Sequence, residues 1–131
     1  MPDPTKVIIK TDKAPKAIGP YSAGVRTDCL IFTAGQLGII PESGNIVEGG
    51  IESETRQALT NIQRILEEAG SSLPWVVKTT VFLRDMNDFI RMNAVYADFF
   101  KDNPPARTTV QAAALPKGAA IEIEAIALVV K

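Results

Sequence analysis

The strongest chemical signal in the sequence is a pair of carboxylates near its end. Glu122 and Glu124 are separated by one residue within a run, 121–130, that is otherwise apolar. In a strand both carboxylates therefore lie on one face. Apolar surroundings raise the pKa of a carboxyl group toward the range that suits a general acid or base. These residues alone leave open the alternative that both acids are solubilising charges at an exposed strand end.

Arg107 is the second candidate. It follows two prolines and an alanine and begins a segment of small, uncharged residues, where it shares a strand face with Thr109 and Gln111. A guanidinium with open space around it can bind a carboxylate or phosphate through two parallel hydrogen bonds. A structural ion pair with a nearby acid is equally compatible with the residue type.

Three further positions could contribute to a site. Tyr21 follows a Gly-Pro turn, Gly35 ends an apolar strand where its backbone can approach a ligand, and Asn93 stands on the polar side of an expected helix. Each has a structural alternative: a packed tyrosine, a β-bulge and a solvated asparagine. Cys29 is expected to be a small buried side chain and not a nucleophile.

Composition excludes many other kinds of site. With no histidine and one cysteine among 131 residues, His-based acid–base catalysis, Ser-His-Asp triads and His or Cys zinc sites are excluded. No phosphate-binding glycine loop or metal-binding carboxylate motif occurs, so we expect neither cofactor nor metal. A net charge of -1 offers no field for nucleic acid or anionic lipid. The apolar runs are too short for a signal peptide or a membrane span, so we expect a cytoplasmic protein.

The elements that must position these residues follow from hydrophobic spacing within a single domain, residues 1–131. Helical spacing predicts helices over about 51–69 and 88–100, the first closed by Gly70. Strands are predicted over residues 7–10, 29–36, 75–83, 107–115 and 121–130. The order β-β-α-β-α-β-β indicates an α+β fold with two helices on one face of a single sheet.

The pattern of the strands predicts an oligomer. Segments 75–83 and 121–130 are apolar on both alternating faces, which indicates burial on both faces, but two helices cover only one. Another subunit is the most economical cover for the other face. Arg107 and Glu122 begin strands that run in opposite directions, which would separate them by about 20 to 25 Å at ~3.3 Å per residue. If they share a site, different subunits supply them.

Together and in this order, these segments resemble the Rid (YjgF) family of reactive intermediate deaminases. The resemblance covers almost the whole chain. It rests on residues 14–22, 35–36, 77–83, 86–89, 93–96, 105–108, 115–117 and, most specifically, 121–127. It implies a chorismate-mutase-like α+β fold, a homotrimer whose sheets form a central β-barrel, and ligand clefts between subunits.

The resemblance also implies roles for individual residues. Arg107 matches the arginine that binds the substrate carboxylate, and Glu122 matches the acid associated with the catalytic water. Three other positions of the family's ligand cleft correspond in this sequence to Tyr21, Gly35 and Asn93.

Two positions depart from the usual family pattern. Ala34 stands where a serine is common, which bears on substrate preference. Thr109 stands where a cysteine is common, so no thiol nucleophile is available there, and Thr109 is expected to contact the substrate.

The activity that the resemblance implies is hydrolysis of 2-iminobutanoate and 2-iminopropanoate, which pyridoxal-phosphate dehydratases release, to 2-oxo acids and ammonia without a cofactor. Two alternatives come from other classes of protein. One is a non-catalytic module that binds 2-oxo acids or related carboxylates in the same cleft. The other is nucleic-acid processing, against which the acidic pI and the absence of basic runs argue.

Overall fold

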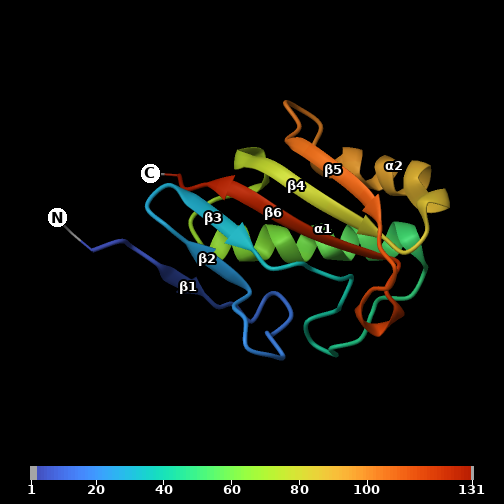
Figure 1. Cartoon of the computed structure of the whole chain (residues 1–131), viewed down its shortest axis with the longest axis horizontal. Coiled ribbons are helices and arrows are strands. Elements are labelled where there is room, and N and C mark those ends of the chain that lie inside the picture. Colours follow the sequence, from blue (N-terminus) through green and yellow to red (C-terminus); the bar gives the residue numbers. More distant parts are fainter. Residues whose placement is uncertain (1–2, 131) are drawn as a thin grey trace.

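The computed structural model describes residues 3–130, which form one mixed β-sheet and two α-helices (Figure 1). Within these residues the sheet has the strand order β1-β2-β3-β6-β4-β5. Strands β4 and β5 are parallel, and the other neighbouring pairs are antiparallel. The strands are β1 (Val7–Ile9), β2 (Gly24–Arg26), β3 (Leu30–Thr33), β4 (Val76–Leu83), β5 (Ala106–Gln111) and β6 (Ile121–Leu128).

Both helices, α1 (Ile51–Glu68) and α2 (Phe89–Phe99), lie on the same side of the sheet, as predicted, and α1 runs behind β6 in Figure 1. Helix α1 ends where Gly70 adopts a φ of 89°, a conformation that favours glycine. Short 3₁₀ turns precede β4, α2 and β6: η1 (Leu73–Trp75), η2 (Met86–Asp88) and η3 (Pro116–Gly118). No helix in residues 3–130 has the length and apolar character needed to cross a membrane.

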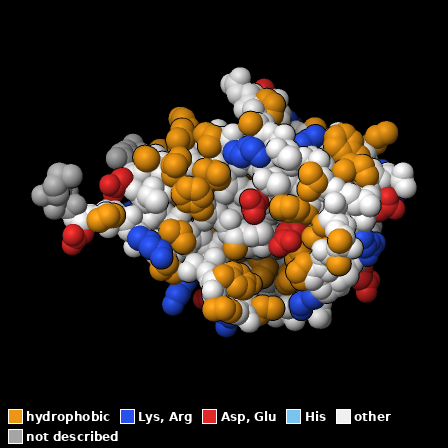
Figure 2. Space-filling view, in the orientation of Figure 1, with side chains coloured by type: hydrophobic (Ala, Val, Ile, Leu, Met, Phe, Trp, Pro, Cys, Tyr) orange, Lys and Arg blue, Asp and Glu red, His pale blue; other side chains and the backbone are white. Residues whose placement is uncertain are grey.

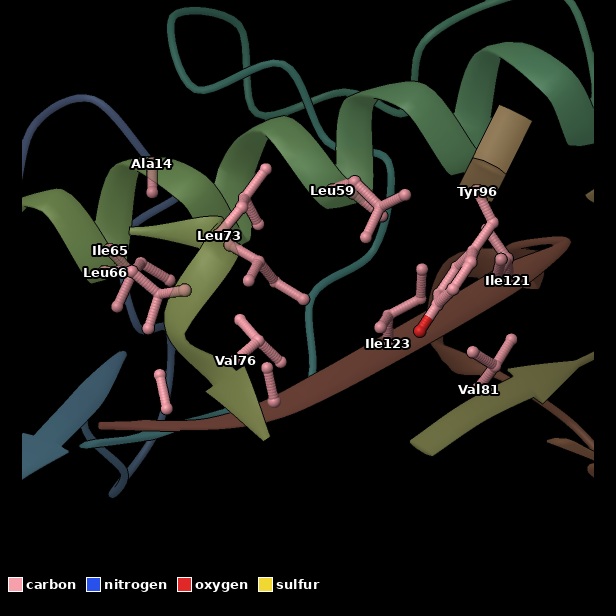
Figure 3. Packing of buried hydrophobic residues seen from close by; sticks show 14 of the residues in the cluster. Ala14, Leu59, Ile65, Leu66, Leu73, Val76, Val81, Tyr96, Ile121 and Ile123 are labelled. Atoms are coloured by element: carbon pink, nitrogen blue, oxygen red, sulfur yellow. The ribbon is translucent and has the colours of Figure 1, made fainter. Parts of the chain in front are cut away.

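The hydrophobic core lies between α1 and the sheet. Leu59 of α1, Val81 of β4 and Ile123 of β6 are each fully buried. Figure 3 shows these side chains in the space between helix and sheet, with Tyr96 of α2 reaching into the same layer. Because side chains alternate along a strand, the buried set of β6 leaves Glu122 and Glu124 on the opposite face.

That opposite face, called the open face below, carries apolar side chains that no other part of residues 3–130 covers. Phe32, Val110 and Leu128 are each about 40% exposed, at 40%, 40% and 38%. Figure 2 shows hydrophobic side chains distributed over this side of the molecule, with acidic side chains among them. We predicted that the long strands are buried on both faces. Within residues 3–130 of one chain, only the face that packs against the helices is buried.

Three sequence-based predictions differ from the structure. Strand β2 was missed because its sequence, Gly-Val-Arg, has a single β-branched residue, unlike the three apolar residues of β1, so the order is β-β-β-α-β-α-β-β. Strands β3 and β5 end at Thr33 and Gln111, earlier than predicted. Cys29 is exposed, not buried, because it lies in the turn before β3, where its N–H donates to the Thr27 hydroxyl.

Candidate active site

Glu122 and Gly35 lie against each other beside the open face. Strand β6 directs Glu122 to this face, and Gln36, which follows Gly35, exchanges two backbone hydrogen bonds with Ile123 at 2.7 and 3.0 Å. This pairing brings Gly35 so close to Glu122 that a Cβ atom at position 35 would lie 2.8 Å from the carboxyl carbon. Glycine is therefore required here to leave room for the Glu122 carboxylate.

A cleft of about 770 Å³ opens beside this pair. Tyr21, Ala34, Gly35, Lys117 and Glu122 are among the residues that line it. Tyr21 is about half exposed, at 51%, and its hydroxyl accepts a hydrogen bond from the Ile18 N–H at 3.4 Å. The aromatic ring and the carboxylate thus face the same space, as a ligand site requires.

Burial raises the pKa of the Glu122 carboxyl group above its usual range, and the negative charge of Glu124 raises it further. Both causes act against ionisation. The burial of Glu122 agrees with the expectation that one of the two acids has a raised pKa. Because its pKa is closer to neutrality, Glu122 suits the exchange of protons with water or a leaving group.

Arg107 lies on the other side of the sheet. In β5 it is paired with the buried Thr79 of β4, and its guanidinium carbon lies 4.7 Å from the ring centroid of Tyr96 and 5.5 Å from that of Phe89, both in α2. No ion pair within residues 3–130 involves Arg107. Among residues 3–130, therefore, the alternative that Arg107 forms a structural ion pair is wrong.

Asn93 and Thr109 lie on the same side as Arg107. Asn93 is four residues after Phe89 and three before Tyr96, so the helical repeat puts it on the same face of α2. The Asn93 Oδ1 and Thr109 Oγ1 atoms are both buried and have no hydrogen-bond partner within residues 3–130. Asn93 as a whole is only half-buried, so the alternative of a solvated residue fails for its Oδ1 atom alone, which lacks the partner that a buried polar atom requires.

The predicted site residues thus fall into two groups within one chain. Tyr21, Gly35 and Glu122 line the cleft, and this group is called the acid half-site. The other group is called the arginine half-site and consists of Asn93, Arg107 and Thr109. The structure brings together the members of the acid half-site but keeps them apart from the arginine half-site.

The distance between Arg107 and Glu122 is shorter than predicted, but their side chains lie on opposite faces of the sheet. They are paired with Thr79 and Phe82 of β4, the strand between β5 and β6. Three residues along the strand at ~3.3 Å each and two strand spacings of ~4.8 Å put their Cα atoms about 14 Å apart. The prediction of 20 to 25 Å is wrong because it extended the first strand to residue 115, whereas β5 ends at Gln111 and Glu122 lies level with Val110. The two side chains nevertheless project from opposite faces of the sheet, so one subunit cannot bring them together.

Two aromatic residues that contact Arg107, Phe89 and Tyr96, were not singled out as site residues from the sequence. Both belong to the apolar stripe of the second helix, which is the usual pattern of core residues. Their spacing of seven residues with Asn93 between them was the signal that they share a face with a candidate ligand residue.

Comparisons with known proteins match nearly the whole chain. The family model described as Endoribonuclease L-PSP matches residues 11–129. The human protein named 2-iminobutanoate/2-iminopropanoate deaminase is 53% identical over 121 residues, which are 92% of this chain and 88% of the human one. A RutC family protein of Pyrococcus abyssi is 52% identical over 122 residues, or 93% and 96% of the two chains.

Solved structures give the same result. The structure of E. coli TdcF with bound serine has a TM-score of 0.90 and 42% identity, and the match covers 93% of this chain and 98% of TdcF. RidA from a Psychrobacter species has a TM-score of 0.91 and 43% identity, with 94% and 99% covered. The α+β fold with two helices on a single sheet is therefore shared with these proteins.

Proposed function

The chain belongs to the endoribonuclease L-PSP family, also called the Rid family, and from this membership we propose that it is a 2-iminobutanoate/2-iminopropanoate deaminase. The enzyme hydrolyses the C=N bond of a short 2-imino acid and gives a 2-oxo acid and ammonia. The observation that carries the proposal is the 53% identity, over 92% of the chain, to a protein of that name. We do not propose an endoribonuclease activity, because a net charge of -1 provides no general attraction for RNA.

Arg107 binds the carboxylate of the substrate. Its guanidinium makes no ion pair within residues 3–130, so its donors are available for two parallel bonds to a carboxylate. The buried, unpartnered oxygens of Asn93 and Thr109 lie on the same side and support a ligand there. A carboxylate held in this way fixes the position of the adjacent C=N carbon.

Glu122 activates the attacking water. The carboxylate accepts a proton from water as the water oxygen forms a bond to the C=N carbon of the protonated imine, and the electron pair of the C=N bond moves to nitrogen, which becomes an amine. The protonated Glu122 then returns its proton to that nitrogen. The C–N bond then breaks as the new hydroxyl gives its proton to the Glu122 carboxylate and becomes the carbonyl group. Ammonia leaves, and Glu122 releases this last proton to water. The raised pKa of Glu122 supports the proton transfers, because a carboxylate with a raised pKa accepts a proton from water more readily than an ordinary glutamate does.

The active site is completed between subunits of a homotrimer with a chorismate-mutase-like fold. Two observations support this assembly: Arg107 and Glu122 project from opposite faces of one sheet, and the described part of the chain, residues 3–130, leaves the apolar open face uncovered. Packing of three open faces around a central barrel would bury that surface. The arginine half-site of one subunit then faces the acid half-site of the next. We place this trimer in the cytoplasm, where its short-lived substrates are released.

The activity is tested by ammonia release from freshly generated 2-iminopropanoate and 2-iminobutanoate. The parent protein accelerates release, and Arg107→Ala removes most of the acceleration. If Arg107→Ala hydrolyses both imino acids as fast as the parent, the role of Arg107 is wrong. If the parent itself gives no acceleration, the deaminase proposal is wrong.

The shared site is tested by mixing two inactive variants. Arg107→Ala and Glu122→Ala chains are unfolded, mixed in equal amounts and refolded. A site in the mixed trimer is complete only if its Arg107 comes from a Glu122→Ala chain and its Glu122 comes from an Arg107→Ala chain. Random assembly then restores about one quarter of the parent activity. Each variant refolded alone is the control and stays inactive. If the mixture stays as inactive as the controls while it forms trimers, the two residues do not act across an interface.

The serine bound in E. coli TdcF favours a second candidate function, a module that binds small carboxylates without turnover. Such a module would be stabilised against heat by 2-oxobutanoate and would release no ammonia from imino acids. Glu122→Gln separates the two candidates, because it reduces turnover in a deaminase but has no activity to reduce in a binding module.

A further inference from the structure

Arg107 is half-buried, and its surroundings contain two aromatic rings but no ion-pair partner within residues 3–130. We propose that Phe89 and Tyr96 are positioning residues, which hold the Arg107 guanidinium by their ring faces and so leave its hydrogen-bond donors for the substrate carboxylate. This inference rests on the proposed function for the identity of the carboxylate. It adds two residues of α2 to the machinery of the site.

The geometry is that of a cation held between two rings. The guanidinium carbon of Arg107 is 4.7 Å from the centroid of Tyr96 and 5.5 Å from that of Phe89. Both distances are within the ~6 Å over which a cation is attracted to the negative face of an aromatic ring. Contact with two rings on one helix restricts the guanidinium to a single place between α2 and β5.

Tyr96 is itself firmly held. Only 6% of it is exposed, its hydroxyl is 2.7 Å from the Thr79 hydroxyl, and its ring packs on Phe100 with centroids 4.7 Å apart. Thr79 is the residue paired with Arg107 in the sheet. Tyr96 is thus fixed to the strand beside Arg107, and Figure 3 shows its ring extending from α2 toward the sheet. Burial raises the pKa of Tyr96, so its hydroxyl stays neutral and forms no ion pair with Arg107.

An aromatic partner has an advantage over an acid at a site that binds carboxylates. A carboxylate from the protein would form bidentate bonds to the guanidinium and would compete with the substrate for the same donors. A ring face attracts the cation without accepting those bonds. The arginine is therefore oriented and at the same time available for the ligand.

The experiment compares two substitutions of Tyr96. Tyr96→Leu removes the ring, and Tyr96→Phe keeps the ring but removes the hydroxyl. The readouts are kcat and KM for 2-iminobutanoate, and the Kd for 2-oxobutanoate measured by calorimetry. For Tyr96→Leu we expect both KM and Kd to rise by about 5- to 30-fold, the range that corresponds to loss of a partly desolvated cation–π contact. The value of kcat changes less, and Tyr96→Phe restores most of the affinity.

The matched control is Phe99→Leu in the same helix. Phe99 makes a similar contact, 5.8 Å from the guanidinium carbon of Arg56, but it is not in the site. This variant keeps the parent KM and Kd. It accounts for any general effect of exchanging an aromatic residue of α2 for leucine.

Three results overturn the positioning role: an unchanged KM and Kd in folded Tyr96→Leu, equal losses in Tyr96→Leu and Tyr96→Phe, or an equal loss in Phe99→Leu. If Tyr96→Leu does not fold, the partly exposed Phe89 decides the question. Phe89→Leu must then raise KM and Kd, and unchanged values overturn the proposal. Absence of imine hydrolysis by the parent is a separate result, which refutes the deaminase proposal while the Kd for 2-oxobutanoate still tests the aromatic contacts.

Discussion

The substitution Gly35→Ala isolates the contact between the backbone and Glu122. The backbone at Gly35 does not have the positive φ that favours glycine, so alanine can adopt it without strain. The added methyl carbon would lie 2.8 Å from Cδ and 3.0 Å from Cγ of Glu122. Carbon atoms normally pack at ~3.5 to 4.0 Å, so the Glu122 carboxyl group must move by about 0.7 to 1.2 Å.

A displacement of this size has a predictable cost in catalysis. A reacting group misplaced by about 1 Å can lose ~10²-fold in rate, which is about 2.7 kcal/mol of transition-state stabilisation. Ammonia release from 2-iminopropanoate by Gly35→Ala should therefore show kcat/KM reduced by about 100-fold. The melting temperature should change little, because the displaced group is the end of a flexible side chain and alanine reduces the entropy of the unfolded chain.

The control is Glu122→Ala in both backgrounds. If Gly35→Ala acts only by displacing Glu122, the double variant is no slower than Glu122→Ala alone. A folded Gly35→Ala enzyme with the parent kcat/KM would refute the steric argument. A double variant that loses a further factor of about 100 would show that Gly35 acts independently of Glu122.

Three further predictions concern charge and packing. Glu124→Gln removes a charge that raises the pKa of Glu122, so the acidic limb of the kcat/KM profile should move to lower pH, and an unmoved limb would exclude this coupling. Glu122→Gln should raise the melting temperature at pH 7, because an acid whose pKa is raised by folding destabilises the fold once it is ionised. This gain should disappear as the pH falls toward the ordinary glutamate pKa of about 4.3, and a gain independent of pH would contradict it. Leu59→Ala, at a fully buried position, should reduce the free energy of unfolding in urea by about 2 to 5 kcal/mol, and a smaller loss would mean that the core relaxes around the cavity.

The sequence was a good guide wherever a feature depends on neighbouring residues. The first helix was predicted over 51–69 and is found at Ile51–Glu68, because its apolar residues recur with the helical period and Gly70 ends it. The two-residue period of β6 likewise placed Glu122 and Glu124 on one face of the sheet. Composition alone excluded histidine chemistry, because the chain contains no histidine.

The sequence was a poor guide wherever a feature depends on which segments pair. It did not indicate that β4 lies between β5 and β6, nor that Glu122 is level with Val110, and the missing register gave the wrong separation for Arg107 and Glu122. It did not indicate the close approach of Gly35 to Glu122, which follows from the bridge between Gln36 and Ile123. The exposure of Cys29 was missed because a turn residue before a strand has the same local pattern as a strand residue.

By itself, therefore, the sequence determined the residue types available for chemistry and the local elements that carry them, because hydrophobic period and chemical type are properties of short segments. Only the tertiary structure decided which faces those elements present to one another. It separated the acid half-site from the arginine half-site and set Phe89 and Tyr96 beside Arg107. The physical reason is that strand order and helix docking are set by burial of apolar surface between residues far apart in the chain.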